Sequence, residues 1–417
     1  MSNDTQPEIR FPGFTDDWEE RKLKDIFDIH TDFVSNGSFQ ALKDNVKLYK
    51  TENYAYMIRL QDASNNWSGP WLYTDKQGFD FLSKSMVYKD DILMSDRGTI
   101  GKFFLVPQLD KPMTLSSNAV LLRSTKNDNN FIYYMLNTSN ISNQIIVRTT
   151  PGVQPMISKT EFKKINTRIP NIQEQQKIGS FFKQLDNTIA LHQRKLDLLK
   201  ETKKGFLQKM FPKNGAKVPE IRFPGFTGDW EERKLTELAT TYIGLVTTMT
   251  KNYTESGTLL IRNSDIKEGK FDLNNPIYLK EDFAEQNKTR RMRNGDVVTV
   301  HTGDIGTSAV ITEDLEGTIG FATITTRPSK ELDSNFLSWY FNSNIHKKYA
   351  RRMSTGDGRS NYNMKDFNKN VIAMPAISEQ QKIGTFFKQL NDTITLHQRE
   401  LDVLKETKKG FLQKMFV

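Results

Sequence analysis

Apolar side chains recur at alternating intervals of four and three residues in two long stretches, 174–211 and 379–416. This alternation averages 3.5 residues, which is the period of a coiled-coil seam. One seam position in each stretch is a histidine, His192 and His397. The pattern predicts two long helices, each with one apolar stripe to bury. The predicted seam consists of Ile178, Phe182, Leu185, Ile189, Leu196 and Leu199 in the first stretch, and of Ile383, Phe387, Leu390, Ile394, Leu401 and Leu404 in the second.

The two stretches are copies of one another, with 32 of 38 positions identical. Two near-identical stripes are natural partners, so we expect the two helices to pack together. Pro170 and Pro375 stand just before the copies, where the chain must enter each helix, while Gly205 and Gly410 predict a kink or an end in the last turns. A seam histidine can be a pH sensor, a ligand, or a packed, hydrogen-bonded residue that sets the register, and the last interpretation is favoured.

A shorter phrase is also written twice. Residues 7–23 read PEIRFPGFTDDWEERKL and residues 219–235 read PEIRFPGFTGDWEERKL, so 16 of 17 positions are identical. Two stretches of 150 and 143 residues, 24–173 and 236–378, separate the short copies from the long ones and differ from each other. We call these stretches the first and second filling, and the copies the repeated frame. Such repeats define the architecture before any single residue does. The predicted domains are 1–172 (including 7–23), a central helix at 173–211, 212–377 (including 219–235) and a C-terminal helix at 378–417.

The short phrase is interpreted as a clasp, that is, a segment that ties the start of each domain to the repeated helices. Phe11, Phe14 and Trp18 supply apolar anchors in the first copy, with a Pro-Gly turn between the two phenylalanines. The phrase is therefore predicted to mark a boundary and not a site.

The two fillings resemble each other in the order of their predicted elements. Runs rich in β-forming residues come first, a helical patch follows at 129–145 or 334–353, and a glycine-containing loop ends each filling. DDILMSDRGTIG (90–101) also lines up with GDVVTVHTGDIG (295–306) at the offset of the long copies. The sequence therefore predicts an α+β fold with two pseudo-symmetric globular domains that share a fold and differ in surface.

Composition narrows the class of protein. Hydrophobic residues make up 36% and charged residues 26% of the 417 positions, which is typical of a globular chain. No apolar run approaches the ~18 residues of a membrane span, and the N-terminus lacks the features of a secretory signal. The chain has no cysteine, so disulfides and thiolate metal sites are excluded. We expect a cytoplasmic protein.

Motifs for catalysis are mostly missing from the sequence. There is no GxxxxGK[ST] phosphate loop, and no GxGxxG opens a helix after a strand. Asn275–Tyr278 is the nearest match to a methyltransferase motif and is interpreted as a turn, because it lacks the second proline. Glu20–Lys22 has no Pro-Asp partner for nuclease chemistry. Since two of only five histidines lie on the seam, we predict no metal site and no catalytic residue.

The net charge of +9 fits either solubility alone or a nucleic-acid partner. Loops at matching positions in both fillings favour nucleic acid, because Lys and Arg bind phosphates while Arg, Asn, Gln, Ser and Thr also bind base edges. The candidates in the first filling are Ser95, Arg97, Thr99, Lys102, Arg148, Thr149, Thr150, Gln154 and Lys159. Those in the second are Arg290, Arg291, Arg293, His301, Thr302, Lys347, Lys348, Arg351, Arg352, Arg359, Asn361, Tyr362 and Asn363.

This organisation resembles the specificity (S) subunit of a type I restriction–modification system. Two diverged domains lead into the repeated helices through IPNIQEQQKI (169–178) and MPAISEQQKI (374–383). DDILMSDRGTIG is also similar to the family's GDILxSxxGTIG strand and turn, from which the second copy departs by Val-His-Thr before the glycine. The resemblance covers nearly the whole chain.

The resemblance implies a division of labour. Each filling would form a target recognition domain that reads one half of a bipartite site in double-stranded DNA, and the helices would pack as an antiparallel coiled coil that sets the spacer. Two methylation subunits carrying S-adenosylmethionine, and restriction subunits using ATP and Mg, would dock on this scaffold. The chain itself would hold no cofactor and catalyse nothing.

Two other classes of protein stay open at this stage. A non-catalytic coiled-coil adaptor that holds two protein-binding domains would bind DNA weakly and without sequence preference. A standalone DNA enzyme would need the cofactor and metal motifs that the sequence lacks.

Overall fold

The computed structural model describes residues 5–117, 119–213, 215–246, 250–354 and 361–417. The chain divides into two compact units: unit 1 is 1–191 with 401–417, and unit 2 is 192–400. Both units take part of each long helix, α8 (Ile172–Lys209) and α14 (Ile377–Lys414), so the division differs from the predicted domain limits. None of the described helices is both long and apolar enough to span a membrane.

Unit 1 is built on two four-stranded sheets, with strand orders β2-β9-β6-β7 and β4-β3-β8-β5, and a two-stranded ribbon of β1 and β10. β3 and β8 are parallel neighbours, and the other paired strands of unit 1 are antiparallel. The strands are β1 (Glu19–Lys22), β2 (Ile29–Asp32), β3 (Ala55–Ile58), β4 (Tyr73–Thr74), β5 (Met86–Val87), β6 (Ile92–Met94), β7 (Phe103–Leu105), β8 (Met113–Leu115), β9 (Val120–Arg123) and β10 (Asn166–Ile169).

Short helices surround these sheets, and the predicted helical patch at 129–145 is two helices, α5 and α6, instead of one. The α-helices before α8 are α1 (Leu23–Ile26), α2 (Phe39–Asn45), α3 (Leu60–Ser64), α4 (Lys76–Phe81), α5 (Asn129–Leu136), α6 (Ser139–Arg148) and α7 (Lys159–Lys163). The 3-10 helices are η1 (Phe33–Asn36) and η2 (Ser83–Ser85).

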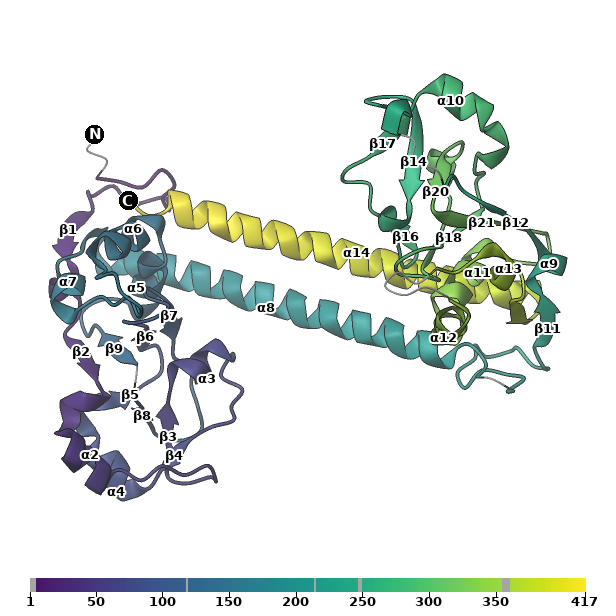
Figure 1. Cartoon of the computed structure of the whole chain (residues 1–417). Helices are drawn as coiled ribbons and strands as arrows, with labels where there is room; N and C mark the ends of the chain where they lie inside the picture. The colour runs from purple at the N-terminus through teal and green to yellow at the C-terminus, as the bar shows by residue number, and fades with distance from the viewer. Residues whose placement is uncertain (1–4, 118, 214, 247–249, 355–360) are drawn as a thin grey trace. The chain divides into compact units, whose positions relative to one another are not determined.

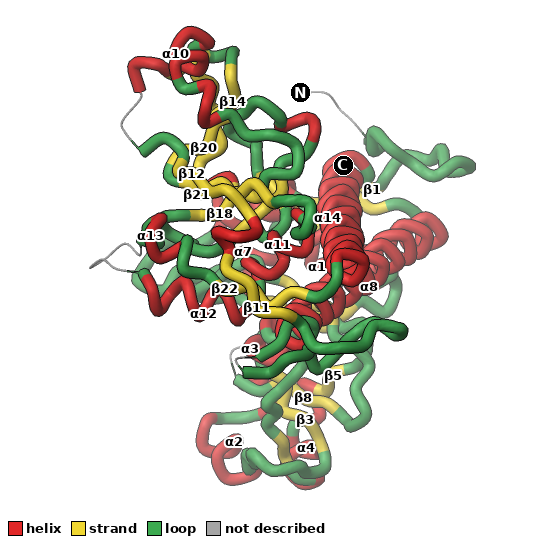
Figure 2. The backbone as a smooth tube through the Cα atoms, turned by 90° about the vertical axis from the view of Figure 1, so that its right-hand side faces the viewer, coloured by secondary structure: helices red, strands yellow, loops and turns green. Residues whose placement is uncertain are grey.

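Unit 2 repeats this plan, with sheets β12-β21-β18-β19 and β13-β17-β14-β20, a parallel pair β14–β20 and a closing ribbon of β11 and β22. The strands, yellow in Figure 2, are β11 (Glu231–Lys234), β12 (Ala239–Ile243), β13 (Tyr253–Thr254), β14 (Thr258–Arg262), β15 (Ile266–Lys267), β16 (Lys270–Phe271), β17 (Ile277–Leu279), β18 (Val297–Val300), β19 (Ser308–Val310), β20 (Ile319–Phe321), β21 (Thr323–Pro328) and β22 (Val371–Met374). The helices are α9 (Leu235–Leu238), α10 (Glu281–Gln286), α11 (Ser334–Asn342), α12 (Asn344–Met353), α13 (Met364–Phe367), η3 (Thr250–Asn252), η4 (Asn263–Asp265), η5 (Lys288–Arg290) and η6 (Glu313–Leu315). The predicted α+β fold with two pseudo-symmetric domains is confirmed.

The central strand of each unit is buried on both faces. In β6, Ile92 and Met94 join the core that contains α5, whereas Leu93 joins a second core against the mixed sheet β4-β3-β8-β5. A strand buried on both sides has no polar face, which is why this segment reads as a continuous apolar run. Val297 and Val298 of β18 divide between two cores in the same way.

The long helices pack antiparallel in both units, as predicted. In unit 1 the rings of Phe181 and Phe411 lie 5.2 Å apart, and in unit 2 those of Phe206 and Phe386 lie 5.1 Å apart. These are the same two repeat positions exchanged between the helices, since 386 − 181 and 411 − 206 both equal 205. None of the predicted seam residues is exposed.

The expectation that the helices end at Gly205 and Gly410 is wrong, because α8 continues to Lys209 and α14 to Lys414. The alternative, a kink at these glycines, stays a prediction. Packing overrides the weak helix propensity of glycine here. Met210 and Phe211, just beyond α8, are buried in the core of unit 2, and Met415 is buried in that of unit 1.

The clasp at 7–23 contacts the start of α8, as interpreted from the sequence. The Arg10 guanidinium donates two hydrogen bonds of 2.7 Å to the Glu174 carboxylate, which is fully buried, and a third to the carbonyl of Asp16. Arg222 and Glu379 repeat the two-bond pair at 2.7 Å in unit 2. A bidentate pair of this kind fixes position as well as charge.

Two further repeated positions of α8, Gln175 and Gly179, contact the start of α5 in the first filling. Gln175 accepts a hydrogen bond from the backbone N–H of Asp128 and donates to the carbonyl of Pro170. At Gly179, a Cβ atom would lie 2.4 Å from Asp128 Oδ1 and 2.8 Å from the amide nitrogen of Phe131. The start of α5 can therefore approach α8 only because residue 179 has no side chain.

We predict that Gly179→Ala destabilises the protein by about 1–3 kcal/mol, because the added methyl group overpacks the α5–α8 contact. Gly205→Ala is the matched control on the same helix, since nothing lies within 4 Å of a Cβ there. It should stabilise the protein by up to about 1 kcal/mol through helix propensity. Urea unfolding followed by circular dichroism measures both changes, and equal effects of the two substitutions would contradict the packing account.

Candidate nucleic-acid interface

The two loops that the sequence singled out in the first filling lie against each other in unit 1. One is the turn after β6 (95–102), and the other is the loop between α6 and α7 (149–158). The amide of Gly98 donates to the carbonyl of Pro155, and that of Ile157 donates to the carbonyl of Asp96, both at 3.0 Å. Backbone hydrogen bonds thus join the loops into one surface, which we call the paired loops of unit 1.

The equivalent loops of unit 2 are joined in the same way. Tyr362 donates its amide to the carbonyl of His301 at 2.9 Å, and Thr302 and Asn361 form an isolated β-bridge. Asn263 donates its side-chain amide to the carbonyl of Thr302 at 2.7 Å. These paired loops of unit 2 include 301–307 and the described residues from 361 onward.

Glycines shape both turns through backbone conformation. Gly98 and Gly101 have φ of 73° and 74°, and Gly303 and Gly306 have φ of 101° and 83°. Residues with side chains rarely adopt this left-handed region. The sequence alignment of the two segments is therefore confirmed by matching backbone geometry at both pairs of glycines.

Most candidates of the first filling reach the surface. The exposed ones are Arg97, Thr99, Lys102, Thr150 and Gln154, and the partly exposed ones are Arg148, Thr149 and Lys159. Ser95 is the exception: it is 4% exposed, and its hydroxyl donates to the carbonyl of Arg97, so it shapes the turn from within. Lys159 pairs with Asp32 at 2.8 Å.

The candidates of the second filling divide between surface and interior. Arg293, Lys348, Arg351, Arg352 and Asn361 are exposed, Thr302 and Lys347 are partly exposed, and Arg359 lies outside the described residues. Arg290 donates to the carbonyl of Gly244 at 2.9 Å, and Arg291 to that of Gly317 at 3.0 Å, so both hold neighbouring backbone in place.

Tyr362 has no exposed surface, so the structure gives it a packing role in place of the predicted base contact. Its hydroxyl accepts a hydrogen bond from Asn370 at 2.6 Å. His301 is only 9% exposed, and burial lowers the pKa of its ring. Asn363 caps α13, because its side-chain oxygen accepts from the amide of Asp366 at 2.9 Å.

A buried histidine, His346, packs against Gly306 in the paired loops of unit 2. His346 on α12 has its Nδ1 2.9 Å from the carbonyl oxygen of Phe341, and its ring would be 3.3 Å from a Cβ at Gly306. Burial lowers the pKa of His346 to about 4. The ring is therefore neutral at neutral pH and packs as part of the core.

An Asp–Arg pair anchors the central strand of each unit. Asp91, just before β6, accepts two hydrogen bonds of 2.6 Å from Arg123. Asp296, just before β18, accepts bonds of 2.8 and 2.6 Å from Arg327. Both carboxylates are only 2% exposed, so these pairs fix the strand from which the turn projects.

The structure places lysines that the sequence analysis did not single out beside two residues that it did. Lys347 and Arg351 line a groove of about 700 Å³ in unit 2 together with lysines from α8 and from the β15–β16 hairpin. The further basic residues of this groove are Lys200, Lys203, Lys204, Lys267 and Lys270. Because these lysines come from separate stretches of the chain, the sequence alone does not show that they lie together.

Exposed apolar side chains also lie at the paired loops of unit 1. Ile146, Val147 and Val153 are 69%, 81% and 109% exposed. Apolar contact with the methyl group of thymine is one way in which proteins read base edges. Ile146 and Val147 lie in the last turn of α6, and Val153 lies in the loop that follows it; the sequence alone does not separate such exposed apolar residues from core positions.

Fold and surface together define a class of protein: a duplicated α+β module on a shared helix pair, with one basic loop surface in each unit. The family model of the type I restriction modification DNA specificity domain matches residues 15–201 and 227–406. The chain therefore belongs to the family of type I restriction–modification specificity subunits.

Individual relatives agree with this assignment. The chain is 23% identical over 410 residues to the putative MjaX specificity subunit of Methanocaldococcus jannaschii, covering 95% of this chain and 92% of that one. It is 22% identical over 404 residues to the EcoBI specificity subunit of Escherichia coli, covering 90% and 79%. The crystal structure of the type I S subunit from M. genitalium shares the fold with a TM-score of 0.62 at 14% identity and covers 99% of both chains.

We predict that His346 makes the stability of the protein pH-dependent. The unfolded chain takes up a proton near pH 6.5 and the folded one only near pH 4, so the contribution is complete above pH 6.5 and is lost as the pH falls toward 4. Between pH 7 and pH 5 this amounts to about 2 kcal/mol. Urea unfolding of His346→Gln should show a shallower pH dependence by that amount, and parallel curves for the two proteins would contradict it.

Proposed function

We propose that this chain is the DNA-reading subunit of a type I restriction–modification complex, in which each unit binds one half of a bipartite target through its paired loops. One observation carries the proposal: the same two loops meet, through backbone hydrogen bonds, in both units, while their side chains differ. A constant loop geometry with different side chains suits two readers of different sequences.

The exposed side chains fit that role chemically. Arg97, Thr99 and Gln154 in unit 1, and Arg351 and Asn361 in unit 2, offer the donors and acceptors that bind guanine, adenine and phosphate oxygens. The groove beside Lys347 would supply further phosphate contacts, mainly through the lysines that do not pair with Glu268, since Lys203 and Lys347 do. Phosphate contacts would set the position of each unit, and the loop residues would specify the bases.

We further propose that the chain is not catalytic and acts in the cytoplasm as a scaffold for two methylation subunits and for restriction subunits. S-adenosylmethionine, ATP and Mg would then belong to those partners. A solved structure from work on the complex assembly and conformational transition of the type I R-M system shares the fold, with a TM-score of 0.52 at 16% identity, and covers 98% of this chain and 99% of that one.

The helices would set the spacer between the two half-sites. Each of them has 38 residues, which corresponds to roughly 57 Å at ~1.5 Å per residue. A rigid helix pair of fixed length suits a target whose two halves are separated by a fixed number of base pairs.

We predict that exchanging residues 24–173 for the corresponding filling of another family member changes only one half of the DNA target. Methylome sequencing of cells that express the chain with its methylation partners measures the two-part adenine-methylated motif. Exchange of 236–378 is the matched control and should change only the other half. No bipartite motif, or a motif unchanged by both exchanges, would favour the protein-binding adaptor instead.

We also predict that removing one heptad from both helices, 184–190 and 389–395, shortens the spacer by about three base pairs. Seven residues correspond to about 10 Å of helix, and base pairs are stacked about 3.4 Å apart. The deletion from both helices preserves the seam register, whereas the deletion from one helix disrupts it and should abolish methylation. An unchanged spacer in the doubly deleted protein would show that the helices do not set it.

A further inference from the structure

The middle of the helix seam in unit 2 brings a residue together with its own copy. Two antiparallel copies of one sequence exchange their positions, so only a residue near the centre of the repeat can meet its equivalent. His192 and His397 occupy that place, separated by the repeat offset of 205, and their ring centroids are 6.2 Å apart. The duplication therefore creates a histidine pair from a single histidine position.

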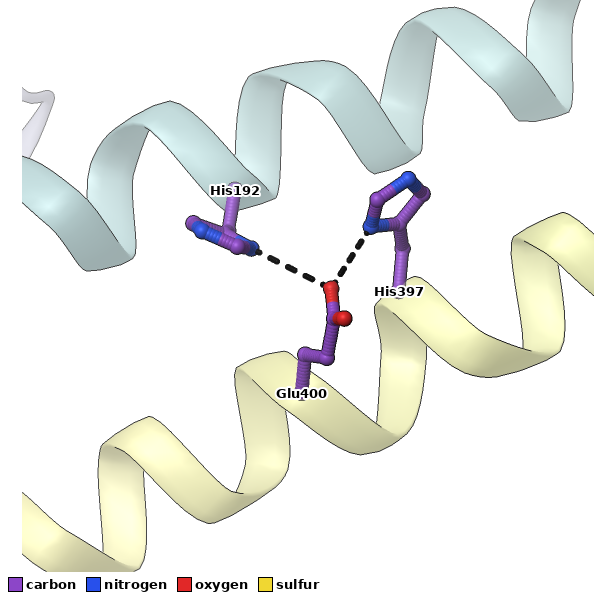
Figure 3. A group of neighbouring side chains, drawn as sticks. All are labelled: His192, His397 and Glu400. Atoms are coloured by element: carbon purple, nitrogen blue, oxygen red, sulfur yellow. Dashed lines mark hydrogen bonds and ion pairs between the residues drawn. The ribbon is translucent and has the colours of Figure 1, made fainter.

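A carboxylate completes this pair (Figure 3). Glu400 Oε2 lies 2.8 Å from Nδ1 of His397 and 3.7 Å from Nδ1 of His192. The donor atoms of the three side chains all lie within 4.8 Å of one another. Among the described residues, this is the one group of three His, Cys, Asp or Glu side chains that is arranged in this way.

One atom of the group lacks a partner. His192 Nδ1 is buried and has no hydrogen bond, because 3.7 Å from Glu400 is too long for one. A buried polar atom without a partner costs free energy, so it calls for an explanation. Figure 3 shows that this ring nitrogen points toward the Glu400 carboxylate, to which the dashed line joins it.

The spacing also suits one metal ion, which would replace the hydrogen bond between His397 Nδ1 and Glu400 Oε2. Two ligands at about 2.1 Å from a tetrahedral ion lie about 3.4 Å apart. The distances of 2.8 and 3.7 Å from the Glu400 oxygen bracket that value. The side chains of His192, His397 and Glu400 are 29%, 13% and 41% exposed, which leaves a water molecule access to a fourth position.

We propose that His192, His397 and Glu400 bind one divalent transition-metal ion of the zinc class, with water as the fourth ligand, and that the ion fastens α8 to α14. Imidazole and carboxylate are ligands that zinc accepts, and the site needs no thiolate. The prediction of no metal site rested on there being only five histidines, two of them on the seam, and it did not consider that packing brings the two seam histidines together.

The carboxylate comes from one copy of the repeat only. Position 195 is lysine where its equivalent, 400, is glutamate, one of six differences in the 38-residue block. Lys195 stands three residues after His192, as Glu400 stands three residues after His397. Lys195 and Glu400 are therefore equivalent positions of the repeat, so a substitution of Lys195 is a matched control for a substitution of Glu400.

Cobalt(II) titration of the full chain, without an affinity tag and stripped by a chelator, tests the proposal. The expected result is saturation at one Co²⁺ per chain, with the visible absorption of a four-coordinate ion that Zn²⁺ abolishes by competition. His192→Gln, His397→Gln and Glu400→Gln should each weaken binding by at least about tenfold, because even the loss of a supporting contact costs that much. Lys195→Gln should bind as the unaltered chain does.

Exchanging the charges at positions 195 and 400 is the most stringent test of the proposal. Glu400→Lys should lose binding, and the double substitution Lys195→Glu/Glu400→Lys should restore it, because the carboxylate then approaches the histidine pair from the other helix. Circular dichroism shows which variants keep the helical fold. No saturable cobalt signal from the unaltered chain, or a signal that survives both histidine substitutions, would overturn the proposal.

Discussion

The rest of the structure depends on one constraint: each long helix must bury its apolar stripe against a second copy of itself. An isolated amphipathic helix in water is marginal, and most of its stability comes from packing. Antiparallel pairing satisfies both copies at once and exchanges their positions, as the Phe181–Phe411 and Phe206–Phe386 contacts show. Each helix consequently contributes to the cores of both units, and neither unit is complete without the second copy.

The repeated frame tolerates divergent fillings because many of its contacts are with backbone atoms. Gln175 binds the amide of Asp128 and the carbonyl of Pro170, and Gln380 binds the amide of Asp333 and the carbonyl of Pro375. Within the frame itself, Arg10 and Arg222 each bind the backbone carbonyl of the one clasp position that differs between the copies, Asp16 or Gly228. Backbone atoms are present whatever the side chains of the filling, so one frame can hold two different surfaces.

The helices, their seam and the duplicated α+β plan could be predicted because repetition and periodicity are visible in one dimension. Which loop residues are buried could not be predicted, since the sequence does not separate a buried polar residue from an exposed one. Tyr362 follows a basic, loop-like stretch and His301 begins a glycine-containing turn, and both are nevertheless buried. Gly205 looked like a helix end, but the buried Met210 and Phe211 beyond it stabilise the last turns.

The few differences between the two copies of the long repeat show how each copy fits its own unit, because the copies are otherwise the same. Position 186 is aspartate and pairs with Lys408 at 2.6 Å in unit 1. Its copy, Asn391, is neutral and accepts from Lys203 at 2.9 Å in unit 2. Lys203 finds its carboxylate in Glu268 of the second filling, at 3.7 Å. In the second copy the carboxylate of the frame stands one residue later, at Asp392, which pairs with Lys388. Glu268 of the second filling therefore supplies the carboxylate for Lys203, so frame and filling are matched within this unit.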